Sequence, residues 1–163
     1  MSGEELAEML LGWVARYPIV SVEDPMSEDD AEGFIAFAKA APGHLQIVGD
    51  DFLVTNADRV RAASRDGALN CALIKPNQAG TVSETKAAYD AAKAAGMGAI
   101  VSARSGETED VTIVHLATGW GAKQLKVGSF TRSERMVKWN EGLRIADAIG
   151  SAQLPPRSVF PWG

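Results

Sequence analysis

The chain has 163 residues, 46% of them hydrophobic and 23% charged, which is typical of one globular domain with a sizeable core. A net charge of −5 and the lack of a basic cluster interleaved with aromatic residues argue against nucleic acid as a partner, and no apolar run reaches membrane-spanning length. The acidic N-terminus and the single cysteine, Cys71, predict a protein of the reducing cytoplasm. We expect Cys71 to fill the core rather than act as a nucleophile.

The segment Glu4–Arg16 predicts an opening helix, and five short apolar runs after it predict buried parallel strands. The runs are Ile19–Val22, Leu45–Val48, Ala72–Ile74, Ala99–Val101 and Leu125–Val127. The polar residues that end them are Glu23, Asp50, Lys75, Arg104 with Ser105, and Lys126. These recur every 22 to 29 residues, which is the length of one strand, one helix and two loops. The spacing predicts repeated βα units, as in a parallel barrel.

Five segments between and after the runs are rich in helix-forming residues. The expected helices are Asp29–Ala41, Asn56–Asp66, Thr81–Ala95, Glu109–Thr118 and Ser133–Ile149. The expected N-caps are Thr55 or Asn56, Thr81 and Ser133, and the expected stops are Gly43, Gly67, Gly96 and Gly150. Residues 1–150 therefore predict one α/β unit.

Residues 151–163 form a proline-rich tail in which three prolines argue against a helix. Phe160 and Trp162 are expected to dock onto the body of the protein. A tail that binds another molecule is the alternative.

In a parallel barrel the carboxyl ends of the strands open into one mouth, where barrel enzymes hold their catalytic residues. The acidic pairs Glu23-Asp24 and Asp50-Asp51 would place carboxylates there, which suits Mg²⁺, although helix capping and loop solvation also explain such residues. Lys75 follows an apolar strand and is a candidate base, with an ordinary lysine that keeps its amine in water as the alternative.

The remaining candidates predict an anion site. Arg104 offers a fork of donors, Ser105 a hydroxyl and the following helix its free amides, which together could hold phosphate or carboxylate. Lys126 ends an apolar strand, and a lysine that points into a barrel mouth needs an anionic partner. Together the five units favour a functional site over five unrelated polar residues.

Several of these stretches resemble the signatures of the enolase family, the phosphopyruvate hydratases. They are residues 17–25 (YPIVSVEDP), 49–56 (GDDFLVTN), 74–81 (IKPNQAGT), 104–110 (RSGETED) and 132–135 (RSER). The resemblance covers about residues 2–150 and corresponds to the later part of an enolase barrel. It implies an incomplete TIM barrel of about five parallel strands alternating with helices.

The resemblance also implies roles for the candidate residues. Glu23 and Asp50 would be two of three carboxylate ligands of Mg²⁺, with Asp51 beside them. Lys75 would be the base, in the pattern of a lysine base with Mg²⁺ that is known for enolase-type enzymes. Arg104 and Ser105 would hold the phosphate of the substrate, and Lys126, a catalytic and substrate-binding residue, would contact the carboxylate and the metal region. The expected reaction is dehydration of an acid of the 2-phosphoglycerate type through an enolate.

The sequence departs from the family pattern at Ala103, where enolases usually have histidine beside the phosphate-binding residues. One Mg²⁺ ligand and the glutamates that help to expel hydroxide would also come from earlier barrel sequence. We therefore expect the isolated chain to be inactive. A changed substrate, such as a phosphonate analogue in natural-product biosynthesis, is a further possibility consistent with Ala103.

Five parallel strands cannot close an eight-stranded barrel, so two sheet edges and much of the apolar interior are expected to be open. The first hypothesis is a split enzyme, in which a separate enolase-like N-terminal chain supplies the missing strands. The second is a half-barrel without catalytic activity that self-associates through its edges and serves as a binding or structural protein.

Overall fold

The computed structural model describes residues 1–150 and 152–163, and its centre is one parallel sheet. The strands lie in the order β1-β2-β3-β4-β5, so each neighbour in the sequence is also a neighbour in the sheet. Their bounds are β1 Ser21–Glu23, β2 Gln46–Gly49, β3 Cys71–Ile74, β4 Gly98–Ser102 and β5 Gln124–Lys126. This order confirms the predicted succession of βα units, and each strand lies within two residues of the run that predicted it.

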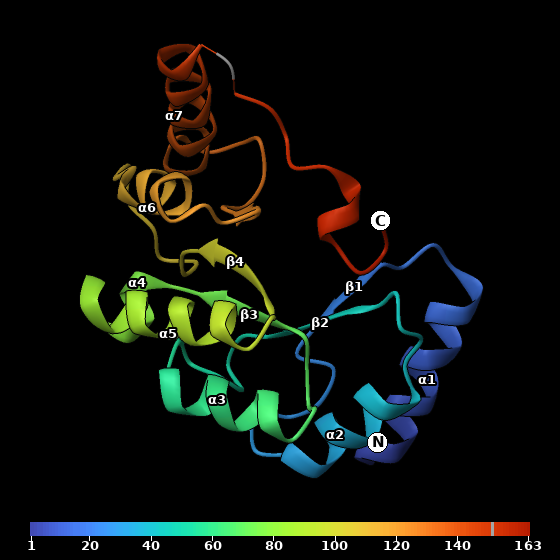
Figure 1. Cartoon of the computed structure of the whole chain (residues 1–163). Coiled ribbons are helices and arrows are strands. Elements are labelled where there is room, and N and C mark those ends of the chain that lie inside the picture. Colours follow the sequence, from blue (N-terminus) through green and yellow to red (C-terminus); the bar gives the residue numbers. More distant parts are fainter. Residues whose placement is uncertain (151) are drawn as a thin grey trace.

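Helices connect the strands and cover the outer face of the sheet (Figure 1). They are α1 Gly3–Arg16, α2 Ala31–Ala40, α3 Ala57–Arg65, α4 Pro76–Ala79, α5 Val82–Ala94, α6 Thr112–Trp120 and α7 Ser133–Ile149. A 3-10 turn, Arg157–Val159, interrupts the tail. The fold is thus an open α/β half-barrel, as the sequence predicted.

Local side chains cap several of these helices, and the caps at Asn56 and Thr81 were predicted from the sequence. The Ser2 hydroxyl accepts from the Glu5 amide and the Glu5 carboxylate accepts from the Ser2 amide, which is a capping box. Asn56 caps α3 and Thr81 caps α5 through their side-chain oxygens. Gly67, Gly96 and Gly150 have positive φ at helix ends, as expected of residues that stop a helix.

Several of the predicted helix boundaries are wrong. The helix expected over Glu109–Thr118 begins at Thr112 and ends at Trp120. Ser133 is the first residue of α7 instead of its cap, and the cap position belongs to Arg132, whose side chain makes no capping hydrogen bond. Helix α2 ends at Ala40 with an extended Ala41 as its C-cap, so Gly43 does not terminate it. The short helix α4 was not expected, because a proline after a strand usually indicates a turn. Pro76 lies in the first turn of α4, a position that proline suits.

The two faces of the sheet bury different side chains. Ile47, Ala72 and Ile74 belong to the large core that the sheet forms with α2, α3 and α5. Val48, Cys71, Leu73 and Ile100 form a separate cluster on the inner face, and each is at most 7% exposed. The alternation places neighbouring residues of one strand on opposite faces.

The interior is therefore more closed than the sequence led us to expect. Among the described residues β1 and β5 each pair with one strand only, so the two open edges are confirmed. The prediction of an open apolar interior is wrong for the four residues of the inner cluster, because they are buried. The sheet curves far enough for the Gln46 and Gln124 amides, on β2 and β5, to exchange hydrogen bonds of 2.8 and 3.2 Å, and this curvature shields the cluster.

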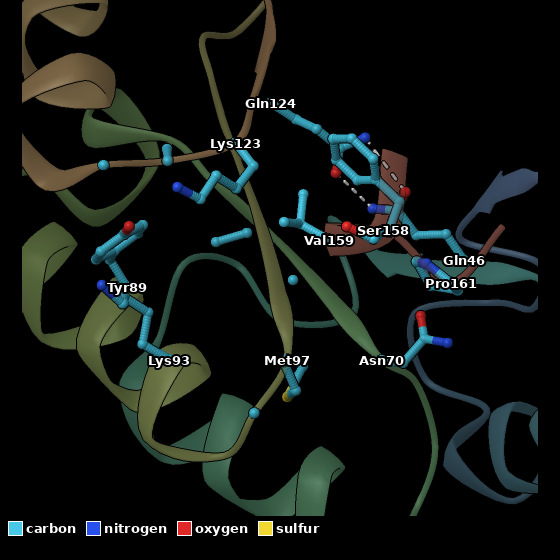
Figure 2. Close-up of a pocket in the computed structure, with 16 residues that line it drawn as sticks. Gln46, Asn70, Tyr89, Lys93, Met97, Lys123, Gln124, Ser158, Val159 and Pro161 are labelled. Atoms are coloured by element: carbon cyan, nitrogen blue, oxygen red, sulfur yellow. Dashed lines mark hydrogen bonds between the residues drawn. The ribbon is translucent and has the colours of Figure 1, made fainter. Parts of the chain in front are cut away.

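A cavity of about 660 Å³ lies at the amino ends of the strands, and the tail forms one of its walls (Figure 2). Gln46, Asn70 and Gln124 line it from the sheet, and residues Ser158–Pro161 line it from the tail. Phe160 thus docks on the body as predicted, while the Trp162 ring stacks on the Phe160 ring with centroids 4.8 Å apart. None of the helices in the described part of the chain is both long and apolar enough to span a bilayer.

Candidate active site

A second cavity, of about 410 Å³, lies at the carboxyl ends of β3, β4 and β5. Its walls come from the ends of these strands and from the loops that follow them. The lining residues are Lys75, Ser102, Ala103, Arg104, Ser105, Lys126, Val127, Gly128, Ser129, Arg132 and Arg135. The structure therefore brings Lys75, Arg104, Ser105 and Lys126 into one cavity, as their positions after successive strands predicted.

This cavity is strongly cationic. Five of its lining residues are lysine or arginine, and none of the described residues that line it is aspartate or glutamate. Three carboxylates stand beside it and pair with its lining: Asp50 with Lys75, Glu23 with Lys126, and Glu134 with Arg132 and, at 3.9 Å, Arg135. Such a wall attracts small anions, and an arginine fork next to a hydroxyl suits a phosphate group.

Lys75 follows β3 and is held from two sides. Its Nζ donates to the Asp50 Oδ2 across 2.6 Å, and both side chains are about one-tenth exposed. Its backbone amide donates to the Thr55 hydroxyl across 3.0 Å, and that hydroxyl donates to the Gln78 side-chain oxygen across 2.7 Å. Lys75 is thus an ordered, buried lysine and does not extend its amine into bulk water.

Lys126 and Glu23 pair across the mouth of the half-barrel. The Lys126 Nζ lies 2.6 Å from the Glu23 Oε2, although the two residues end the first and last strands. The pair is half-exposed, with side-chain exposures of 47% and 32%, so water screens it and it contributes little stability. The pair is informative about geometry, because it shows that the ends of β1 and β5 approach each other beside the cavity.

Asp50 belongs to a cluster of three carboxylates. Asp24, Asp50 and Asp51 each offer an oxygen within 4.8 Å of the others. Asp24 has a raised pKa because burial disfavours its charge, while its oxygens accept from the Asp50 and Asp51 amides at 2.9 and 2.8 Å and partly offset that effect. The Asp50 Oδ1 is buried and accepts no hydrogen bond from the described residues.

The donor set fits a hard cation. Carboxylate oxygens are the ligands that Mg²⁺ prefers, and the free Asp50 oxygen is the atom that lacks a partner. Asp51 lies beside Asp50, as expected, but the cluster contains Asp24 in place of Glu23. From the sequence, Asp24 is a member of the acidic pair after β1, but only Glu23 of that pair is predicted as a ligand.

Backbone strain concentrates around this site. Asp24, Val54, Thr55 and Arg132 are the described residues other than glycine that have positive φ, with values of 42°, 45°, 52° and 70°. A β-branched residue rarely adopts this conformation, so Val54 and Thr55 are unusual as a consecutive pair. Thr55 holds the Lys75 amide and Arg132 lines the cavity. Such outliers often cluster at functional sites.

Comparison with known proteins gives the family. The model described as "Enolase, C-terminal TIM barrel domain" matches residues 1–155. A protein named "Enolase 1" from Desulfitobacterium hafniense (strain Y51) is 48% identical over 161 residues. That alignment covers 98% of this chain and 37% of the relative, so the chain spans little more than a third of the relative's length. The chain belongs to the enolase family and corresponds to the C-terminal part of its TIM-barrel domain.

Proposed function

We propose that this chain forms the C-terminal part of the active site of an enolase-like, Mg²⁺-dependent lyase. The substrate would be a small 2-phospho- or phosphono-hydroxy acid of the 2-phosphoglycerate type, dehydrated through an enolate. The observation that carries the proposal is the placement of Lys75, Arg104, Ser105 and Lys126 around one cavity, beside the Asp50 carboxylate. Family membership supports the reaction class.

In this proposal each residue has a distinct task. Arg104 and Ser105 bind the phosphoryl oxygens, because one provides a fork of N–H donors and the other a hydroxyl at the cavity wall. Lys126 binds the substrate carboxylate and releases Glu23 when it does so. Lys75 accepts the proton from the carbon next to that carboxylate, since its ordered Nζ faces the same cavity.

Asp50 and Glu23 would hold Mg²⁺, with Asp51 beside them and Asp24 as a further neighbouring carboxylate. When bound, Mg²⁺ supplies positive charge that stabilises the negative charge of an enolate. The Asp50 Oδ1 is available for this task without loss of an existing hydrogen bond. The four residues offer only part of what Mg²⁺ needs, so we expect further ligands from earlier barrel strands.

The partner in this proposal is an enolase-like N-terminal half chain that pairs with the free edges of β1 and β5. Two open edges of a parallel sheet favour such pairing, because their backbone groups lack partners on one side. Trp13, Tyr17 and Val20, which precede β1, are 46%, 53% and 39% exposed and would gain cover from it. We place the assembled enzyme in the cytoplasm, where the single thiol of Cys71 would stay reduced.

The test combines this chain with the preceding part of the Desulfitobacterium relative and measures Mg²⁺-dependent loss of 2-phosphoglycerate. Lys75→Arg keeps a cation beside Asp50 but cannot act as a base, because guanidinium does not release its proton at neutral pH. We expect Lys75→Arg and Lys75→Ala both to lower kcat by about 10²- to 10⁴-fold. Lys123→Arg, at the opposite end of the sheet, is the control. Full activity of Lys75→Arg would contradict the assignment of the base.

A second candidate function is a half-barrel without catalytic activity that self-associates as a binding or structural protein. The observations that favour it are the same open edges and Ala103, which lines the cavity without offering a donor. Under this alternative the chain would show no Mg²⁺-dependent turnover of 2-phosphoglycerate, whichever partner is present. Preference for a phosphonate over 2-phosphoglycerate would instead support a specialised lyase of natural-product biosynthesis.

A further inference from the structure

Helix α7 holds the loop that carries Arg104 and Ser105. The loop, residues 104–110, runs from β4 towards α6, and within it the described residues make no hydrogen bond between backbone groups. Among the described residues, one hydrogen bond joins two residues of the loop, and it runs from the Asp110 amide to the Thr108 hydroxyl across 3.3 Å. The loop conformation therefore depends on groups outside the loop.

Lys138 of α7 is the first of these groups. Its side chain is fully buried, and its Nζ donates to the Thr108 carbonyl at 2.7 Å and to the Glu134 carbonyl at 2.9 Å. The same atom lies 2.9 Å from the Glu107 carboxylate, whose side chain is 12% exposed. An ammonium group has three protons, so these three acceptors satisfy it completely. A buried lysine with this set of partners fixes two loop residues in place.

Arg135, one turn before Lys138, is the second group. Its Nη2 donates to the Ser105 carbonyl at 2.7 Å, and its Nη1 lies 3.4 Å from the Val127 carbonyl. The side chain passes over Gly128, which has a φ of +94° and where a Cβ would lie 3.0 Å from the Arg135 Cδ. Glycine at 128 therefore leaves room for the arginine to reach both the loop and the end of β5.

We infer that Lys138 and Arg135 are positioning residues, which hold Ser105 and Thr108 by their carbonyl oxygens so that Arg104 and Ser105 face the cavity. The inference deepens the proposed function and rests on it for the identity of the anion. Arg135 and Lys138 have the same separation along the sequence as Ser105 and Thr108, the loop residues that they bind. Neither residue needs to touch the anion through the bonds described here, although Arg135 also lines the cavity.

The test removes the buried pair without leaving one charge unpaired. Lys138→Met with Glu107→Gln eliminates both charges and the bonds from Lys138 to the carbonyls. Lys86→Met with Asp90→Asn removes an exposed ion pair of α5, at 2.7 Å, and is the matched control. The readouts are backbone NMR order parameters and the affinity of the chain for inorganic phosphate.

We expect the order parameters of residues 105–108 to fall below about 0.6 in the Lys138 variant, while those of β3 stay near about 0.85. Phosphate affinity should fall about tenfold, which corresponds to the loss of about one charge-assisted hydrogen bond. The control pair should change neither readout. An unchanged loop in a folded Lys138 variant would overturn the inference, because a merely structural lysine would lower stability without loosening the loop.

A second variant covers the case in which loss of the buried pair prevents folding. Arg135→Lys keeps a cation at the cavity but loses the fork that reaches both the Ser105 and Val127 carbonyls. We expect greater mobility at Ser105 and unchanged order in β3, and an immobile Ser105 would contradict the inference. If the wild-type chain binds no phosphate, the anion site of the proposed function fails, while the order parameters still decide the positioning role.

Discussion

Cys71 shows how strongly burial changes the chemistry of one residue. Burial raises the pKa of its thiol from 9.0 to about 12, with a smaller contribution from the charge of Glu23 and an opposing hydrogen bond from Gln46. The expectation that it fills the core agrees with its zero exposure.

The shifted thiol predicts a pH-dependent stability. Between pH 9 and pH 12 the thiol ionises in the unfolded chain and stays protonated in the folded one, so the folded state binds more protons. The free energy of unfolding should therefore fall as the pH rises through this window, by up to about 1.4 kcal/mol per pH unit. Urea unfolding of the wild type and of Cys71→Ala, measured from about pH 8 to about pH 10.5, isolates this contribution. Parallel pH curves for the two proteins would contradict it.

Ala103 offers a second prediction at the residue scale, because it lines the cationic cavity without a polar group. Ala103→His adds a donor whose positive form grows below about pH 6.5, so phosphate affinity should rise about tenfold there and less at higher pH. Ala103→Leu adds bulk without a donor and should not strengthen binding. Isothermal titration at two pH values makes the comparison, and a pH-independent gain would contradict the explanation.

At the scale of single elements, β2 is packed against the loop that follows it. A Cβ on Gly49 would lie 2.6 Å from Leu69 and 2.7 Å from Leu53, both of which are buried. Gly49→Ala should therefore lower the free energy of unfolding by about 1 to 3 kcal/mol. Gly142→Ala is the control, since that site in α7 has open space and alanine favours a helix by up to about 1 kcal/mol. Chemical denaturation of both variants tests this, and equal stabilities would contradict the packing described.

The helices and strands were predicted best from the sequence. Short apolar runs between helix-forming segments have few interpretations, so all five strands lie within two residues of their predicted positions. The helix starts at Asn56 and Thr81 followed from side chains that can cap. The sequence could not show that Lys138 is buried, because a charged residue on a helix usually faces water and its three partners are set by the tertiary fold.

The whole molecule is harder to infer from local patterns. The order of the polar residues predicted one shared cavity, which follows from parallel strands in sequential order. The curvature that joins Lys126 to Glu23, and Gln124 to Gln46, depends on how far five strands bend when no others pair with them. For that reason the burial of the inner cluster could not be predicted, nor could the choice of Asp24 over Glu23 as the residue that joins Asp50 and Asp51.

At the largest scale, the central claim is that these five strands are an incomplete barrel that acts as a lyase only when further strands pair with β1 and β5. The most direct measurement is the solution mass of the chain, alone and mixed with the preceding part of the Desulfitobacterium relative. The account predicts a stable one-to-one complex that forms through those edges. A homo-oligomer that ignores the added partner would contradict the claim and favour a half-barrel without catalytic activity.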